Sequence, residues 1–357
     1  MDTAQELVVQ KLISSISEQQ ASDLHISVGV PPMLRINGEL KPITEQGMVD
    51  INFVKAICDA WLSKEQKEKL IQEKEITFGY NFKDKARFKV TIINQQNTYS
   101  ISLKLIPENI IPFDELGFPP VVKEIIEKDK GLIIIAGAYN AGRSSTLASM
   151  IENINQNFSK RIITIEKPIE HIFIDDKSII EQREVEVDVL SYEAGLKNLI
   201  QEDVQVVMLH SMEKPSVIKE VMNVASSGRQ VFTAINSDTT ISAIKKIINS
   251  FSSDDRKQII ELLSGNLSLA IAQKILPRID GGQVLAYEIL IPNRAIKGTI
   301  EEGDLRQLNN FMQTSKGEGM ITMDQKLADL VNNGIIQRET GLANAVVEAD
   351  FLTYLRA

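Results

Sequence analysis

The stretch LIIIAGAYNAGRSS, residues 132–145, decides the fold of this chain. A run of aliphatic residues ends in a loop that begins and closes with Gly137 and Gly142, and hydroxyl side chains follow. The spacing matches the phosphate-binding loop G-x-x-x-x-G-K-[ST], which joins a buried strand to a helix. Backbone N–H groups of such a loop, together with the start of the helix, attract anions. The sequence therefore predicts a strand, a phosphate-binding loop and a helix, in this order.

One position departs from that motif. Arg143 stands where the motif has lysine, and a planar guanidinium fork is not equivalent to a compact ammonium group. Asn140 tolerates a positive φ better than most side chains, so the shape of the loop can survive. ATP and Mg²⁺ are the predicted ligands, with Ser144 as the magnesium ligand. The predicted nucleotide-binding residues are Gly137, Asn140, Gly142, Arg143, Ser144 and Ser145. The alternative is a strand-to-helix turn that no longer binds nucleotide.

The residues after this loop alternate between short apolar runs and helical segments. The runs at 161–165, 204–209 and 230–235 are continuous and apolar, as expected for strands that helices cover on both faces. A mostly parallel α/β sheet follows from this alternation. The last hundred residues are predicted to be mainly helical, with one more strand at 284–290.

The first hundred residues read as a small α+β unit. Its predicted elements are an amphipathic helix near the N-terminus, a hairpin turn at Asn37-Gly38, helices at 50–62 and 63–73, and strands at 86–94 and 98–106 that a polar turn at 95–97 separates. Proline and glycine are dense between residues 107 and 120, and they interrupt regular structure. The predicted division is a domain over residues 1–106, a linker over 107–120 and a second domain over 121–357.

Composition excludes several classes of protein. The chain has 357 residues and a net charge of −9, so it lacks the basic footprint of a nucleic-acid binder. Cys58 is the single cysteine, which excludes a disulfide framework and a thiolate zinc site. The longest apolar run is far shorter than the roughly 20 residues of a membrane span. These features predict a cytoplasmic protein of several domains.

Further segments of the chain resemble the PilT-like retraction ATPases of type IV pili, within the type II/IV secretion ATPase superfamily. They are ASDLHISVGVPPMLRINGEL (21–40), RIITIEKPIEHIF (161–173), SGRQVFTAINSDTT (227–240) and GMITMDQKLADLVNNGII (319–336). The resemblance implies a PAS-like N-terminal domain, a RecA-like P-loop domain with a helical C-terminal part, and a hexameric ring. It also implies that nucleotide binds between the two domains.

The residues that carry chemistry in that family are largely replaced. The acidic motif keeps Glu166 and Glu170, which are the candidate catalytic carboxylates. Ser211 stands where the resemblance implies the Walker B glutamate, and both histidines of the motif after Gly228 are absent. Positions that are basic or histidine in relatives are occupied by Lys89, Gln96, Lys104, Gln201, Glu213 and Asn236. Losing one acid/base group costs about 10²–10⁴ in rate, so the chain is interpreted as a degenerate member, a pseudo-ATPase.

The favoured hypothesis is a regulatory or structural partner in pilus or secretion machinery, with weak or no ATP hydrolysis. It would form a homo-hexamer or a mixed ring with an intact PilT-like paralogue. It would also contact the inner-membrane platform protein of the pilus from the cytoplasmic side, with no nucleic-acid partner. The alternative is an atypical but active retraction motor, in which Arg143 binds phosphate, Ser144 holds magnesium, and Glu166 or Glu170 orients water. A third hypothesis is a scaffold that binds no nucleotide.

Overall fold

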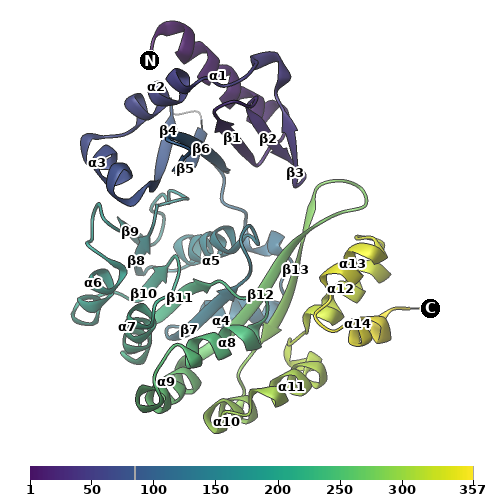
Figure 1. The fold of residues 1–357 in the computed structure, drawn as a ribbon. Coiled ribbons are helices and arrows are strands. Elements are labelled where there is room, and N and C mark those ends of the chain that lie inside the picture. Colours follow the sequence, from purple (N-terminus) through teal and green to yellow (C-terminus); the bar gives the residue numbers. More distant parts are fainter. Residues whose placement is uncertain (84–85, 357) are drawn as a thin grey trace. The chain divides into compact units, whose positions relative to one another are not determined.

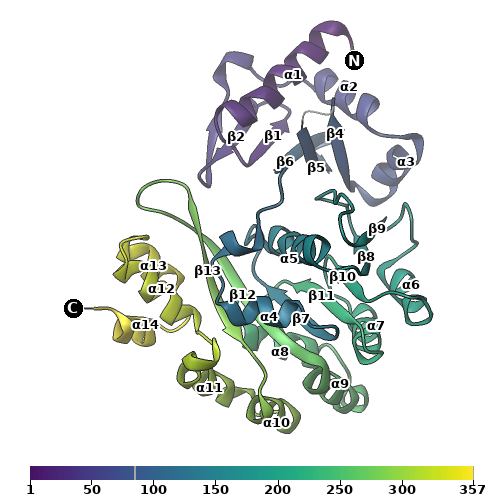
Figure 2. The same cartoon turned by 180° about the vertical axis from the view of Figure 1, so that it is seen from behind.

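The structure is a computed structural model that describes residues 1–83 and 86–356 (Figures 1 and 2). The chain forms two compact units. The first contains residues 1–109 and 167–171, and the second contains residues 110–166 and those from 172 onward. The chain passes from the first unit to the second between Asn109 and Ile110, inside the segment predicted as a linker.

The first unit is built on a six-stranded antiparallel sheet with the strand order β3-β2-β1-β6-β5-β4. Its strands are β1 (Asp23–Ser27), β2 (Met33–Ile36), β3 (Glu39–Pro42), β4 (Glu75–Phe82), β5 (Ala86–Gln95) and β6 (Thr98–Ile106). Its helices are α1 (Thr3–Glu18), α2 (Ile51–Trp61) and α3 (Lys64–Glu73). Apolar residues of all three helices pack in one core cluster with the sheet.

Two-residue turns set the pairing of this sheet. Asn37 and Gly38 join β2 to β3 with φ values of 51° and 87°, and Gln96 and Asn97 join β5 to β6 at 45° and 62°. Positive φ at both central residues gives the turn twist that matches paired strands. The sequence predicted a turn at both places.

The second unit contains a seven-stranded mixed sheet with the order β13-β12-β7-β11-β10-β8-β9. Its strands are β7 (Gly131–Ala136), β8 (Arg161–Glu166), β9 (Ile179–Glu184), β10 (Val206–Leu209), β11 (Gln230–Ile235), β12 (Leu267–Pro277) and β13 (Gln283–Leu290). Neighbouring strands are parallel except β12 and β13, which form a hairpin. The predicted α/β class with a mostly parallel sheet is confirmed.

Helices cover this sheet and follow it towards the C-terminus (Figures 1 and 2). They are α4 (Pro120–Ile126), α5 (Arg143–Asn157), α6 (Tyr192–Lys197), α7 (Pro215–Ser226), α8 (Thr240–Asn249) and α9 (Ser253–Asn266), then α10 (Arg294–Glu302), α11 (Leu308–Thr314), α12 (Met323–Asn332), α13 (Arg338–Asn344) and α14 (Glu348–Tyr354). Within residues 1–83 and 86–356, no helix combines the length and the apolar character that crossing a membrane requires.

One sequence prediction about this unit was wrong. The last hundred residues were expected to hold a single strand, and the structure adds β12 before β13. The apolar run of β12 directly follows Gly265-Asn266 at the end of α9. A short apolar run after such a pair suits a buried strand or a buried helical segment, and local pattern does not distinguish the two.

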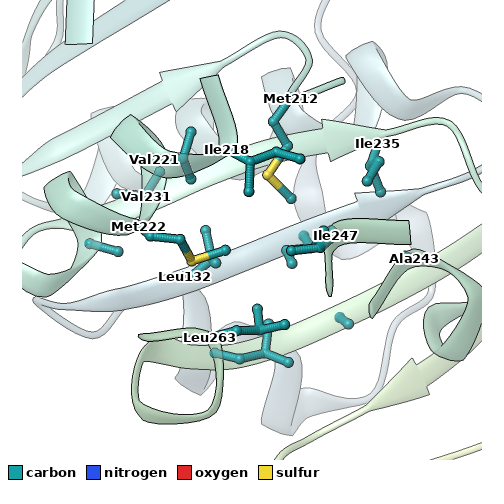
Figure 3. Close-up of a cluster of buried hydrophobic side chains, with 14 of the residues drawn as sticks. Leu132, Met212, Ile218, Val221, Met222, Val231, Ile235, Ala243, Ile247 and Leu263 are labelled. Atoms are coloured by element: carbon teal, nitrogen blue, oxygen red, sulfur yellow. The ribbon is translucent and has the colours of Figure 1, made fainter. Parts of the chain in front are cut away.

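The core of the second unit lies on both faces of the sheet. Leu132 and Ile134 of β7 belong to a cluster with α7, α8 and α9, which Figure 3 shows in part. Ile133 and Ile135, which alternate with them, belong to a second cluster with α4 and α5. Successive side chains of a strand point to opposite faces, so β7 is buried on both sides. This explains its continuous aliphatic sequence.

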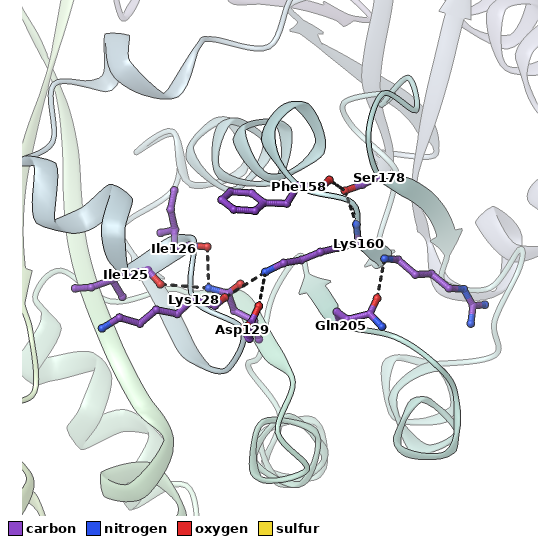
Figure 4. A network of polar contacts seen from close by, with 10 residues as sticks. Ile125, Ile126, Lys128, Asp129, Phe158, Lys160, Ser178 and Gln205 are labelled. Carbon is purple, nitrogen blue, oxygen red and sulfur yellow. Dashed lines mark hydrogen bonds and ion pairs between the residues drawn. The ribbon is translucent and has the colours of Figure 1, made fainter.

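Polar contacts fix the amino-terminal edge of this sheet (Figure 4). The backbone N–H of Arg161 donates to Gln205 Oε1 at 2.8 Å, and the N–H of Lys160 donates to Ser178 Oγ at 3.1 Å. Gln230, at the start of β11, donates from Nε2 to the carbonyl of Ile126 at 2.8 Å. The loop between β7 and α5 lies at the opposite, carboxyl-terminal edge of the sheet.

Candidate phosphate-binding site

The loop between β7 and α5 has the strand–loop–helix arrangement predicted from the sequence. Asn140 and Gly142 adopt left-handed conformations, with φ values of 64° and 83°. The N–H of Ala141 donates to the carbonyl of Ala138 at 3.2 Å, so the loop curls back on itself. Gly142 is the last residue before α5, which begins at Arg143. The chain therefore turns sharply from a buried strand into a helix.

Neither glycine of this loop leaves room for a side chain. A Cβ atom on Gly137 would meet the Cβ of Ala141 at 2.7 Å and the carbonyl oxygen of Gln273 at 3.0 Å. On Gly142 it would meet Cδ1 of Ile275 at 2.8 Å. Real Cβ atoms do not approach other atoms this closely, so packing excludes a side chain at Gly137, and both packing and a positive φ disfavour one at Gly142.

The first turn of α5 is suited to an anion. Among the described residues, no side chain caps this helix by a hydrogen bond at Gly142. Arg143, Ser144 and Ser145 occupy the first turn and are all half-buried. The partial positive charge at a helix N-terminus and the adjacent guanidinium both favour negative charge. All six predicted nucleotide-binding residues thus lie in one continuous loop and helix start.

One residue of this site was not assigned a role from the sequence. Gln273 of β12 is 1% exposed, and its Nε2 donates to the carbonyl of Ala141 at 2.7 Å. Its Oε1 accepts a hydrogen bond from Thr146 Oγ1 at 3.0 Å. Gln273 begins the sequence QKILPR at residues 273–278, and this part of the chain was not predicted as a strand. The sequence therefore offered no sign that it meets the loop.

The carboxyl-terminal ends of β7, β11 and β10 lie at one edge of the sheet, because these strands are parallel. Asn236 follows β11, and Ser211 lies two residues beyond the end of β10. Glu213 accepts a hydrogen bond from the backbone N–H of Asn236 at 2.7 Å. The same carboxylate pairs with Lys246 of α8, which also donates to the carbonyl of Asn236 at 2.9 Å. The Glu213 carboxylate is thus bound by the Lys246 ammonium group and by the backbone N–H of Asn236.

Glu166 ends β8, three strands away from β7. With neighbouring strands about 4.8 Å apart, the two strands are separated by about 14 Å. The Glu166 carboxylate is 3% exposed, and its Oε1 accepts hydrogen bonds from Thr164 Oγ1 at 2.7 Å and Gln182 Nε2 at 3.1 Å. These two hydrogen bonds hold the carboxylate within the sheet, and the catalytic role of Glu166 stays a prediction.

Glu170 belongs to the first unit, where it forms an ion pair with Lys89 at 3.0 Å. Arg87 donates to the carbonyls of Ile169 and Glu170, at 2.6 Å and 2.8 Å. Burial lowers the pKa of the neighbouring His171, while Glu170 acts to raise this pKa and Arg87 to lower it. The second candidate carboxylate is therefore paired with Lys89 of the first unit, and Arg87 binds the backbone beside it.

Lys89 and Lys104, two of the positions where the resemblance implies arginine, lie on paired strands of the first unit. Lys89 of β5 stands directly opposite Lys104 of β6. Gln96 lies in the turn that joins the two strands. Lys89 and Lys104 are thus cross-strand neighbours, whereas Gln96 is at the far end of the hairpin.

Groups of three or more histidine, cysteine, aspartate or glutamate side chains that could hold a metal are absent from residues 1–83 and 86–356. Cys58 is buried, and burial raises its pKa to about 12, so its thiol stays protonated. The prediction that Ser144 is a magnesium ligand therefore rests on its place in the loop.

The fold and the loop together define a RecA-like protein with a candidate phosphate-binding loop. Residues 2–318 match the family described as "Type II/IV secretion system protein", and the chain belongs to this family as a PilT-like member. It is 30% identical to the type IV pilus retraction ATPase PilT of Pseudomonas aeruginosa over 343 residues, 96% of this chain and 99% of that protein. It is 31% identical to the type IV pilus ATPase PilU of the same organism, over 94% of this chain and 88% of PilU.

Solved structures agree with this assignment. A crystal structure of the pilus retraction motor PilT with bound ADP matches with a TM-score of 0.84 and 32% identity, over 96% of this chain and 98% of that one. The Legionella pneumophila ATPase DotB matches with a TM-score of 0.81 over 95% of this chain and 96% of that one. At 20% identity, the likeness to DotB concerns the fold alone.

Proposed function

We propose that this chain is a PilT-like subunit of a type IV pilus or related secretion machine that binds ATP with Mg²⁺ and hydrolyses it weakly or not at all. It acts as a regulatory or structural partner, either in a homo-hexamer or in a mixed ring with an intact PilT-like ATPase. The observation that carries this proposal is a contrast within one sheet edge. The loop after β7 keeps a phosphate-binding shape, whereas Ser211 and Asn236 after β10 and β11 are not bases.

The loop fits the phosphates of a nucleotide. Gly137 and Gly142 let the loop backbone curl and pack against β12 so closely that a Cβ atom on either would collide with its neighbours. Arg143 would pair with phosphate oxygens through its guanidinium group, and the Ser144 hydroxyl would contribute to holding magnesium. Bound Mg²⁺ neutralises part of the phosphate charge. These side chains account for binding and orientation of the nucleotide.

The side chains at the ends of the neighbouring strands do not support hydrolysis of ATP. A serine hydroxyl at Ser211 cannot act as a base at neutral pH without a partner. Its Oγ lies 3.4 Å from Glu213 Oε1, and Glu213 is itself paired with Lys246. Removing one charge-stabilising group costs about 10²–10³ in rate. Hydrolysis is therefore expected far below the roughly 10 per second of an ordinary enzyme.

Calorimetric titration of the full chain with ATP–Mg²⁺, followed by phosphate release, tests this function. We expect saturable binding with almost no phosphate release, and loss of binding in Arg143→Ala. Arg294→Ala is the matched control, because Arg294 is the first residue of α10 as Arg143 is of α5, and it is exposed. Turnover near 10 per second that Arg143→Ala abolishes would instead establish the active motor. No heat at millimolar ATP would establish the scaffold.

A gain-of-function pair sharpens this test. Arg143→Lys alone restores the motif lysine and is expected to leave phosphate release unchanged, because the base is still missing. Arg143→Lys combined with Ser211→Glu returns both groups and is expected to raise phosphate release at least tenfold. If Arg143→Lys alone activates the chain, loss of the base after β10 is not the reason for slow turnover.

A further inference from the structure

Gln273 connects three parts of the second unit that are far apart in the sequence. It lies on β12, next to β7, where Ala272 pairs with Ala136 at the end of β7. Its amide reaches the Ala141 carbonyl in the loop and the Thr146 hydroxyl in the first turns of α5. Its own backbone carbonyl lies against Gly137, 3.0 Å from where a Cβ would stand. One residue thus contacts the start of the loop, its end and the helix.

Both polar atoms of the buried Gln273 side chain form hydrogen bonds, one as a donor and the other as an acceptor. Nε2 donates to a carbonyl, which can only accept, and Oε1 accepts from a hydroxyl. Glutamate would keep the acceptor for Thr146 but lose the donor for Ala141. Methionine has a similar length and offers neither bond. Glutamine is therefore required by hydrogen-bond chemistry, not only by volume.

The bond to Ala141 also sets the orientation of a backbone donor. A trans peptide is planar, so the carbonyl of Ala141 and the N–H of Gly142 point in opposite directions. Because the carbonyl points to Gln273, the N–H of Gly142 points away from β12. Among the described residues, none accepts a hydrogen bond from this N–H. It is left available for an anion held by the loop.

We infer that Gln273 is a positioning residue of the phosphate-binding loop, which holds the Ala141–Gly142 peptide with its N–H directed at a nucleotide phosphate. This inference rests on the proposed function, since it assumes that the loop binds ATP. Gln273 does not touch the nucleotide. It acts through its hydrogen bond to the loop backbone, and its hydrogen bond with Thr146 also connects it to α5.

The test compares ATP–Mg²⁺ affinity of the full chain with that of Gln273→Met and Gln273→Glu, at a temperature where all are folded. Gln230→Met is the matched control, because Gln230 is also a fully buried glutamine whose Nε2 donates to a backbone carbonyl, but at the opposite edge of the sheet. Both Gln273 variants are expected to raise the Kd at least tenfold. Gln230→Met is expected to change the Kd less than twofold while lowering the melting temperature to a similar extent.

Hydrogen exchange of residues 137–146 without nucleotide supplies a second readout. Exchange in this segment is expected to rise at least tenfold in both Gln273 variants and to stay unchanged in Gln230→Met. The inference is wrong if the Gln273 variants bind ATP as the parent chain does, or if Gln230→Met weakens binding equally. If the parent chain binds no ATP, the proposed function is wrong. Hydrogen exchange of residues 137–146 then tests by itself whether Gln273 positions the loop. Unchanged exchange in the Gln273 variants overturns that role.

Discussion

At the residue scale, the loop after β7 depends on two glycines for different reasons. Gly142 has a φ of 83°, where a side chain is strained, and a Cβ atom there would also lie only 2.8 Å from Ile275 Cδ1. Gly137 has no positive φ but faces Ala141 and Gln273. Conformational freedom and close packing therefore contribute separately, and they can be separated by experiment.

Gly142→Ala is expected to abolish ATP binding and to lower the free energy of unfolding by about 2–4 kcal/mol, from backbone strain and crowding together. Gly303→Ala is the matched control: Gly303 has a φ of 79° with nothing within 4 Å of its Cβ position, so it carries the strain alone. It is expected to cost about 1–2 kcal/mol and to leave ATP binding unchanged. Urea unfolding and calorimetry measure both quantities. Equal losses of stability in the two variants would contradict the role of crowding.

At the scale of secondary-structure elements, Glu288 of β13 joins two helices to the sheet. Its Oε1 accepts hydrogen bonds from Thr240 N and Oγ1, at 2.8 Å and 2.5 Å, and Thr240 is the first residue of α8. Its Oε2 lies 3.5 Å from the N–H of Met323, the first residue of α12. A carboxylate suits helix N-termini, which carry partial positive charge. This single side chain therefore ties α12 of the C-terminal part to α8 and β13.

The pKa of Glu288 is raised, chiefly by burial and in part by Asp324, although its hydrogen bonds act to lower it. The folded state therefore keeps its proton at pH values where the unfolded state has lost it, above about 4.5. Because the folded state then binds more protons, the free energy of unfolding falls as the pH rises from 4.5 through the raised pKa.

Glu288→Gln, which cannot titrate, is expected to remove this fall. Glu288→Ala is expected to destabilise the chain at all pH values, by about 1–3 kcal/mol for each donor left unpaired. The measurement is the free energy of unfolding in urea between pH 4.5 and 8. Parallel pH curves for the parent chain and Glu288→Gln would show that Glu288 does not titrate differently in the folded state.

On the scale of the whole molecule, the proposed hexameric ring explains how a subunit that hydrolyses little ATP can work beside an active ATPase subunit. If the chain is mixed with an intact PilT-like ATPase from its own organism, we expect sedimentation velocity to detect hexamers containing both chains. ATP should promote this assembly, since the proposed nucleotide would order the loop of the second unit. Hexamers of this chain alone that exclude the other protein would favour the homo-hexamer. Monomers under all conditions would show that the ring is wrong.

Local features were predicted well from the sequence. The turns at Asn37-Gly38 and Gln96-Asn97, and the strand, loop and helix around residues 131–157, depend on glycine or asparagine conformation and on the period of apolar residues. Such signals act over a few residues. The strand β12 was not predicted, because its apolar run after Gly265-Asn266 suits a buried strand and a buried helical segment equally well.

Short-range backbone preferences and the period of apolar residues were enough to predict the class of fold and the position of the candidate phosphate-binding loop from the sequence. Only the tertiary structure decided that Gln273 meets Ala141, 132 residues away, and that Glu288 meets Thr240. It also decided that Glu166 lies three strands from β7. The physical reason is that sheet order and register are set by packing of the whole core, so a motif identifies its own residues but not their distant partners.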